Sequence, residues 1–484
     1  MPPVTVISKV DNVLRLQVDI PLTRDMMVSE DNILNAANAV GLAATEHLLS
    51  SFDSDGSPII MGTVKMTSKG LVPKVYHTPF GAIDVKRHVY QTSAGGSIFC
   101  PLEHNARIIL TSTPRFAAQI SRKSAEMASA SVAQDLEVNH NRKIAKHFVQ
   151  RLSKVVAAGI QAKEEAWTYD TPLQQEKIST ISIGLDGANV PMSDGSWRQA
   201  MTGTITLYDA EGKRLHTTYS AAAPEHGKET FKARFERDIN HICDLYPNAL
   251  RIGIADGAVD NWSFLERFTQ KQTLDFYHAT EYVADVANCL FDSDDLRKKW
   301  LGNRCHQLKN FEGGAADLLE EVVSFYQHVL KKTSPTILTF KTKVIDSSPL
   351  DVALADECED SAVIEAAILP VEHPTIKEET IKVMKPFKKN VDTKALDAFV
   401  SYFQNNLAKS RMSYAKNLEE KLPIGSGVTE SACKMIIKSR LCQSGMRWKD
   451  EGIGIILSLR TLAKSNGKWD KFWGKVNQYG FPEI

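Results

Sequence analysis

The chain has 484 residues, of which 43% are hydrophobic and 24% are charged, as in globular proteins, and its length predicts about two to four domains. No run approaches the roughly 18 consecutive apolar residues that span a membrane. The start at Met1–Val4 lacks the basic and apolar regions of a signal peptide. Seven scattered cysteines without a Cys-x-x-Cys pair argue against a disulfide framework. We therefore expect a cytoplasmic protein without a membrane partner.

The formal net charge is +0, but the signs are segregated along the chain. Residues 344–380 carry ten acidic side chains against one lysine, a net charge of −9. Residues 381–484 carry 19 basic against nine acidic side chains, a net charge of +10. A basic C-terminal part favours a polyanion as partner. A solvated loop beside an ordinary basic surface has the same composition, and that alternative stays open.

Two regions precede the first clear strand pattern. Residues 1–110 are predicted as mixed strands and turns, with breakers at Thr78–Gly81 and Gly95–Ser97. Residues 111–172 are predicted as helical. Within them a short helix at Val132–Leu136, a polar turn and a basic helix over Arg142–Arg151 have the layout of a helix-turn-helix. An ordinary pair of amphipathic helices with a basic face fits equally well.

Residues 173–285 change to strand periodicity. Alternating segments at 180–185, 202–207 and 215–219 are followed by a helix over 228–245, a buried strand at 250–255, another helix and a strand at 273–277. The resulting order, β-β-β-α-β-α-β, predicts an α/β fold with a ribonuclease-H-like mixed sheet. In that topology the first strand pairs with the fourth.

Two near-repeats place an acid beside glycine at the ends of these two strands, namely Ile183–Ala188 with Asp186 and Gly253–Ala258 with Asp256. Two carboxylates that meet repel each other, so one takes up a proton unless a cation is shared. A third acid, Glu430, follows the glycine-rich turn Gly425–Gly427. Mg²⁺ prefers oxygen ligands of this kind, and two ions can serve a phosphoryl transfer. Each aspartate alone is more often an ordinary turn residue.

This ordered set of motifs resembles the DDE transposases of bacterial insertion sequences, in particular the ISKra-type family. The matching segments are Leu185–Ala188, Ile254–Ala258, Gly425–Ala432 and Gly445–Trp448. The resemblance implies that Asp186, Asp256 and Glu430 bind two Mg²⁺ ions, for which Mn²⁺ can substitute. It implies cleavage of element ends, strand transfer into target DNA and location at the bacterial nucleoid. At least a dimer is expected, because two ends must be held together.

The resemblance also bears on His278. Asp275-Phe276-Tyr277-His278 looks like an Asp-x-x-His element of related transposases, which would place His278 near the scissile phosphate as a hydrogen-bond donor. A core histidine is the alternative. Many relatives carry paired cysteines before the helical region, whereas only Cys100 lies there in this chain. End recognition through a zinc-binding unit is therefore not expected.

Glu430 follows Asp256 by about 174 residues, far more than a ribonuclease-H core needs. We expect a mainly helical insertion over residues 286–421 with an acidic loop at 344–380, and the last part of the core with basic helices over 422–484. Lys434 and Lys438 lie at i+4 and i+8 from Glu430, on one helical face. The residues expected to contact DNA are Arg142, Lys143, Lys146, Lys434, Lys438, Arg440, Arg447 and Lys449.

Three functions share this pattern: an active transposase, a nuclease that cuts without joining, and a catalytically inactive DNA-binding protein derived from a transposase. The sequence favours the first, because the acidic triad is complete.

Overall fold

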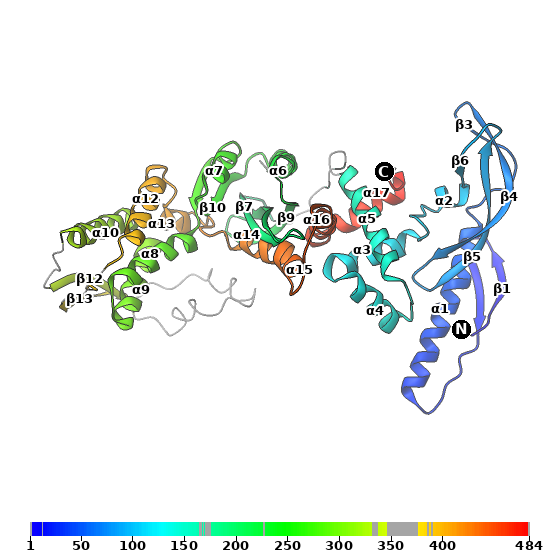
Figure 1. Ribbon diagram of the computed structural model, residues 1–484, viewed down its shortest axis with the longest axis horizontal. Coiled ribbons are helices and arrows are strands. Elements are labelled where there is room, and N and C mark those ends of the chain that lie inside the picture. Colours follow the sequence, from blue (N-terminus) through cyan, green and yellow to red (C-terminus); the bar gives the residue numbers. More distant parts are fainter. Residues whose placement is uncertain are drawn as a thin grey trace.

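The structure is a computed structural model that describes residues 2–11, 13–163, 167, 169, 176–225, 228–331, 337–345, 376–384, 387–388 and 391–482. It is a mixed α/β protein whose parts follow one another along an elongated molecule (Figure 1). An N-terminal sheet lies at one end, then a helical cluster, a central five-stranded sheet and a second set of helices. No helix in the described part of the chain has the length and apolar character to cross a membrane.

The N-terminal region holds two small sheets and one long helix. Strands β1 (Val4–Val10) and β2 (Val13–Val18) form an antiparallel pair. A four-stranded antiparallel sheet follows in the order β3 (Ile59–Met61), β4 (Val64–His77), β5 (Ala82–Thr92) and β6 (Gly95–Phe99), with the short helix α2 (Pro101–Asn105) after it.

Helix α1 (Met26–Ser50) contradicts the expectation that this region contains only strands and turns. Asp25 begins the helix, because its side chain accepts a hydrogen bond from the backbone of Val28. Only five of its residues are buried, three of them small, so no continuous apolar stripe marks the helix in the sequence.

Helices α3 (Pro114–Glu126), α4 (Ser129–His140) and α5 (Lys146–Lys163) confirm the predicted helical region. The second helix of the expected pair begins at Lys146 rather than Arg142, because α4 runs on to His140 and is ended by Asn141 in the left-handed region, at φ 50°.

These helices share a hydrophobic core with the C-terminal helices α16 (Asp450–Lys464) and α17 (Lys468–Tyr479). Residues 109–160 and the C-terminal helices therefore pack together as one helical cluster beside the central sheet (Figure 1).

The central sheet has the strand order β11-β10-β7-β8-β9. Strands β7 (Thr180–Pro191), β8 (Trp197–Tyr208) and β9 (Arg214–Ala222) are antiparallel neighbours. Strands β10 (Leu250–Ala255) and β11 (Lys271–Leu274) run parallel to β7 on its other side. The predicted pairing of the first strand with the fourth is therefore confirmed. The last strand ends earlier than predicted, because Asp275 begins a helix.

Helices cover both faces of this sheet. Residues of a strand alternate between its faces, so neighbours on β8 meet different helices. Gly203 lies against Phe235 of α6 (Glu229–Leu245), whereas the hydroxyl of Thr204 lies 2.7 Å from that of Thr429 in α14 (Gly427–Ala432). The short helix α7 (Val259–Leu265) follows β10. The acid-bearing helix α14 thus packs directly on the sheet to which Asp186 belongs.

The predicted insertion is mainly helical, as expected. Its helices are α8 (Phe276–Leu290), α9 (Asp294–Asn310), α10 (Gly314–Leu330), α12 (Lys394–Ala408) and α13 (Tyr414–Glu419). An antiparallel pair, β12 (Ile337–Ile345) and β13 (Ile376–Met384), was not predicted. The ends of the acidic segment, 344–345 and 376–380, belong to these strands, and residues 346–375 lie outside the described part.

The helix after Glu430 is not regular. Helix α14 passes into a π-helical turn, η4 (Cys433–Lys438), and then into α15 (Ser439–Leu441). A π-turn accommodates an extra residue, so side chains beyond it leave the α-helical spacing. The assumption that Lys434 and Lys438 continue one α-helical face from Glu430 is therefore wrong.

Candidate functional site

Asp186 and Asp256 come from adjacent parallel strands of the central sheet. Asp256 directly follows β10, and pairing between β7 and β10 ends at Gly184 and Ile254, two residues before each acid. Strand β7 itself continues to Pro191, so Asp186 does not end the strand as predicted. Both carboxylates line one open cavity of about 300 Å³, together with Lys228 and Asn261.

Local hydrogen bonds orient these two acids. The backbone N–H of Gly187 donates to Asp186 Oδ1 at 2.6 Å. Asp256 Oδ1 accepts from the backbone of Ala258 at 3.2 Å and from the Nδ2 of Asn261 at 3.3 Å. Burial raises the pKa of Asp186, and the negative charges of Asp256 and Glu430 raise it further against the opposing hydrogen bonds. The charges of Asp256 and Glu430 therefore act on Asp186.

Glu430 lies in a tight group with two residues from the start of α8. Among the residues that the structure describes, Asp275, His278 and Glu430 are the group whose possible ligand atoms all lie within 4.8 Å of one another. Asp186, Asp256 and Glu430, which the sequence predicted to converge on metal ions, do not form such a group among the described residues. Asp186 and Asp256 line one cavity, whereas Glu430 is grouped with Asp275.

Asp275 is fully buried and connects α8 to the turn before Glu430. Its Oδ1 accepts from the backbone of Tyr277 and of Ser426, each at 3.1 Å. The hydroxyl of Ser426 lies 2.7 Å from Asp275 Oδ2 and 2.8 Å from Glu430 Oε1. Burial raises the pKa of Glu430, and its hydrogen bond and repulsion with Asp275 add to the rise. Glu430 is therefore held by a serine that also binds Asp275.

Asp275 was not predicted as a site residue, although the same signal that identified Asp256 applied to it. Both acids directly follow a short buried strand of the parallel half of the sheet. Because parallel strands end at the same edge, such acids gather there.

His278 lies in the first turn of α8 with its Nδ1 atom 3.0 Å from Glu281 Oε2. Burial by itself lowers the pKa of His278, but the charges of Asp275, Glu281 and Glu430 outweigh it and raise the pKa. His278 therefore binds a proton more tightly beside these acids than a free imidazole does. The alternative of a core histidine is wrong, because the side chain is 37% exposed.

Glycines in the two near-repeats allow side chains of other helices to approach the backbone closely, as the sequence indicated. A Cβ atom at Gly184 would lie 2.2 Å from Thr429 Oγ1, one residue before Glu430. Gly257 has a φ of 108°, and its backbone lies against Tyr402, whose hydroxyl donates to the carbonyl of Asp256 at 2.6 Å. Asp186 and Asp256 thus lie close to positions where a side chain from another helix contacts the backbone.

The predicted DNA-contacting residues fall into two groups. Six of them are exposed: Lys143, Lys146, Lys434, Lys438, Arg447 and Lys449. The prediction is wrong for the other two, Arg142 and Arg440, because both side chains are buried. Arg142 donates to the carbonyl of Thr78 at 3.2 Å, and Arg440 donates to that of Met127 at 3.2 Å and lies over the ring of Trp448. Burial lowers the pKa of Arg440 to about 10.

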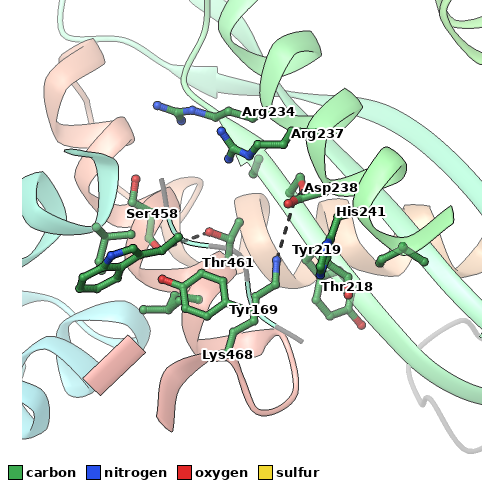
Figure 2. A pocket seen from close by; sticks show the side chains of 16 residues that line it. Tyr169, Thr218, Tyr219, Arg234, Arg237, Asp238, His241, Ser458, Thr461 and Lys468 are labelled. Atoms are coloured by element: carbon green, nitrogen blue, oxygen red, sulfur yellow. Dashed lines mark hydrogen bonds and ion pairs between the residues drawn. The ribbon is translucent and has the colours of Figure 1, made fainter. Parts of the chain in front are cut away.

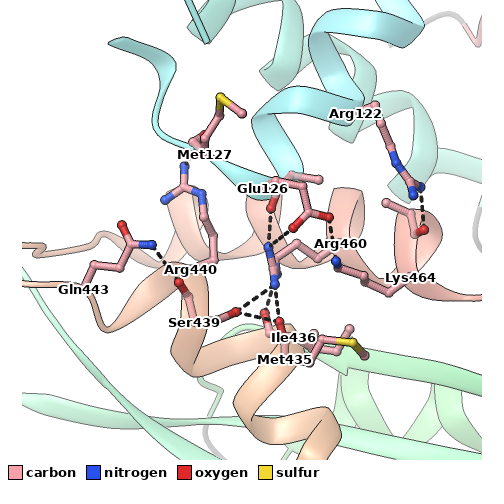
Figure 3. Close-up of polar contacts among 12 residues, drawn as sticks. Arg122, Glu126, Met127, Met435, Ile436, Ser439, Arg440, Gln443, Arg460 and Lys464 are labelled. Atoms are coloured by element: carbon pink, nitrogen blue, oxygen red, sulfur yellow. Dashed lines mark hydrogen bonds and ion pairs between the residues drawn. The ribbon is translucent and has the colours of Figure 1, made fainter. Parts of the chain in front are cut away.

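A buried arginine ties the π-turn after Glu430 to the helical cluster (Figure 3). Arg460 of α16 donates to the carbonyls of Met435 and Ile436 in η4 and to that of Ala125 at the end of α3. Its guanidinium also lies 3.2 Å from Glu126, which pairs with Lys464 at 2.8 Å. The arginine thus binds carbonyl groups of the irregular turn and fixes α3 against it.

Comparisons with known proteins do not assign a family. No protein-family model matches the chain, and no curated protein matches it. Among solved structures, a crystal structure of NurA bound to dAMP and manganese is similar at 11% identity, over 57% of this chain and 64% of that one, with a TM-score of 0.11. The matched region spans less than two thirds of NurA, and a likeness this low carries no argument about fold or function.

Proposed function

We propose that this chain is a metal-dependent DNA transposase with a ribonuclease-H-like catalytic core. The observation that supports it most is the cavity shared by Asp186 and Asp256 at the ends of adjacent parallel strands, with Glu430 close enough to raise the pKa of Asp186. The three-strand meander followed by two parallel strands agrees with this core.

The donor set fits a divalent cation. Asp186, Asp256 and Glu430 offer only carboxylate oxygens, the ligands that Mg²⁺ and Mn²⁺ prefer. Burial and mutual repulsion raise the pKa of Asp186, so a cation that neutralised the acids would be bound favourably. Asp275, which is buried, adds a fourth carboxylate beside Glu430. Two bound Mg²⁺ ions would stabilise the charge on the attacking and leaving oxygens of a phosphodiester.

The surrounding residues orient the acids and the DNA. Asn261 holds the carboxylate of Asp256, and Ser426 holds that of Glu430. His278, with its raised pKa, is a hydrogen-bond donor for a phosphate oxygen near Glu430. The exposed Lys434 and Lys438 follow Glu430 in the chain and supply positive charge for the DNA backbone.

Replacement of Asp186 tests the proposal. We expect Asp186→Asn to abolish Mg²⁺-dependent strand transfer of labelled DNA from the element's ends, and to weaken Mn²⁺ binding at least tenfold by calorimetry, because a ligand oxygen charge is lost. DNA binding in the absence of metal should be retained. The exposed Asp244→Asn is the matched control and should behave as the parent protein. Full activity of Asp186→Asn would refute the assignment.

The same assay separates the two alternatives. Cut DNA without joined products identifies a nuclease that does not join. Bound DNA with neither cutting nor Mn²⁺ binding identifies an inactive DNA-binding protein.

A further inference from the structure

A second cavity lies at the outer edge of the central sheet, enclosed by β9, α6, α16 and the start of α17 (Figure 2). Its volume is about 60 Å³, and it shares no lining residue with the cavity of Asp186 and Asp256. At roughly 10–15 Å³ for each water, the space holds about four waters or one ion of similar size. It is too small for most organic ligands, which take about 300 Å³ or more.

The charged side chains around this cavity are mainly cationic. Helix α6 contributes Arg234, Arg237, Asp238 and His241, whose spacing of three or four residues places them on one face. Lys468 reaches the cavity from the first residue of α17. Three lysine or arginine side chains therefore face one carboxylate, and Figure 2 shows both arginines on the same side of the space.

Asp238, the carboxylate among the described lining residues, does not pair with Arg237. Asp238 accepts a hydrogen bond from the hydroxyl of Ser220 at 2.5 Å, and Lys468 Nζ lies 3.8 Å from it. The guanidinium of Arg237 makes no hydrogen bond or ion pair with any side chain in the described part of the protein. Within the described residues, the cavity thus keeps the positive charge of Arg237 without a paired carboxylate.

A buried donor points to the same chemistry. The Nε2 atom of His241 is buried and has no hydrogen-bond partner among the residues that the structure describes. A buried polar atom without a partner costs about 1–3 kcal/mol, so a ligand that binds it is favoured. An oxyanion in the cavity would accept from His241 Nε2 when this nitrogen carries the proton, and Arg237, which also lines the cavity, would supply positive charge.

We propose that this cavity is a phosphate-binding site formed by Arg237, Lys468 and His241. A tetrahedral phosphate group has the size, the charge and the several acceptor oxygens that the three donors require. The phosphate comes either from a DNA backbone or from a free anion. The proposal stands on this cavity alone and does not depend on the role of Asp186.

The first measurement is the melting temperature of the full chain in potassium phosphate and in potassium chloride of equal ionic strength. A ligand that binds only the folded protein raises this temperature. Phosphate also stabilises proteins by exclusion from their surface, but that effect is the same in all variants. We expect the phosphate-dependent increase in the parent protein and in Lys232→Gln, a charge-matched control on α6 outside the cavity. In Arg237→Gln and Lys468→Gln, the phosphate-dependent increase in melting temperature should fall by about half or more.

A second measurement distinguishes the two sources. If a DNA phosphate enters the cavity, Arg237→Gln should reduce the slope of log affinity against log salt for a labelled duplex by about 0.9, and Lys232→Gln should not. If Arg237→Gln loses the phosphate-dependent increase in melting temperature but keeps the salt slope for DNA, the ligand is a free anion. An equal phosphate shift in all variants, with equal salt slopes, overturns the proposal. Asp186→Asn should change neither the phosphate-dependent increase in melting temperature nor the salt slope, so a failure of the catalytic assignment is recognised separately.

Discussion

The charged form of Asp186 is disfavoured by burial and by the negative charges of two neighbouring acids. Its pKa is raised first by burial and then by the charges of Asp256 and Glu430. An acid with a raised pKa binds protons more tightly in the folded than in the unfolded protein. The folded state therefore loses stability as the pH rises from the unfolded pKa through the folded pKa. Such a cost is typical of residues arranged for binding rather than for stability.

Without metal, Asp186→Asn should stabilise the fold at neutral pH. We expect a melting temperature higher by roughly 2–4 °C at pH 7 in a chelator, because the neutral amide has no charge to bury. The difference should disappear near pH 4 and below, where the aspartate is protonated. Thermal unfolding of both proteins between pH 4 and pH 8 measures this. A parent protein that is more stable than the variant at pH 7 in chelator contradicts the proposed charge repulsion.

At the scale of elements, helix α14 is placed by its contact with the sheet. Gly184 of β7 leaves room for Thr429, whose hydroxyl lies 2.7 Å from that of Thr204 on β8. This contact brings the helix that carries Glu430 onto the strand that carries Asp186. The π-turn η4 then follows, and Arg460 binds its carbonyls from α16. The third acid is thus held from the sheet on one side and from the helical cluster on the other.

Gly184→Ala should separate α14 from β7, because its Cβ would lie 2.2 Å from Thr429 Oγ1. We expect a loss of about 2–3 kcal/mol in the free energy of unfolding by urea denaturation, the usual cost of overpacking. The double variant with Thr429→Ala removes the clashing atom and should recover part of the loss. Gly302→Ala is the control, since nothing lies near its Cβ, and should stabilise helix α9 by about 0.5–1 kcal/mol. Equal effects at both glycines would argue against the contact.

At the scale of the whole molecule, positive charge lies on several separate surfaces rather than on one helix. Lys143 and Lys146 are exposed before and at the start of α5, and Lys434 and Lys438 are exposed in the π-turn η4. Arg142 and Arg440, by contrast, are buried and connect elements of the fold. A basic residue in the sequence is therefore a DNA contact only where the tertiary structure leaves its side chain at the surface.

Lys434→Ala should weaken DNA binding and reduce its salt dependence, with a slope lower by about 0.9 for one lost phosphate contact. The melting temperature should stay the same, because the side chain is exposed. Arg440→Gln should instead lower the melting temperature, since it breaks buried contacts to Met127 and Trp448. Binding titrations at several salt concentrations and thermal unfolding test both. A Lys434→Ala variant with unchanged affinity and slope would exclude this lysine from the DNA path.

Local patterns in the sequence determined the strands and helices of the central part of the chain. The alternation of residues 180–185, the apolar run at 250–255 and the order of the elements predicted that β7 and β10 are neighbours, which places Asp186 and Asp256 around one cavity. These predictions succeeded because buried strands and their crossovers follow from short-range periodicity and chain handedness. The near-repeats around both acids and glycines also indicated close backbone contacts.

Only the tertiary structure decided how the remaining groups are arranged. The pairing of Asp275 with Glu430 joins residues far apart in the chain through Ser426. The burial of Arg142 and Arg440, the π-turn after Cys433 and the cationic cavity at β9 depend likewise on packing between distant elements. Periodicity shows which face of an element is apolar, but not which partner covers it, because that choice depends on side chains throughout the fold.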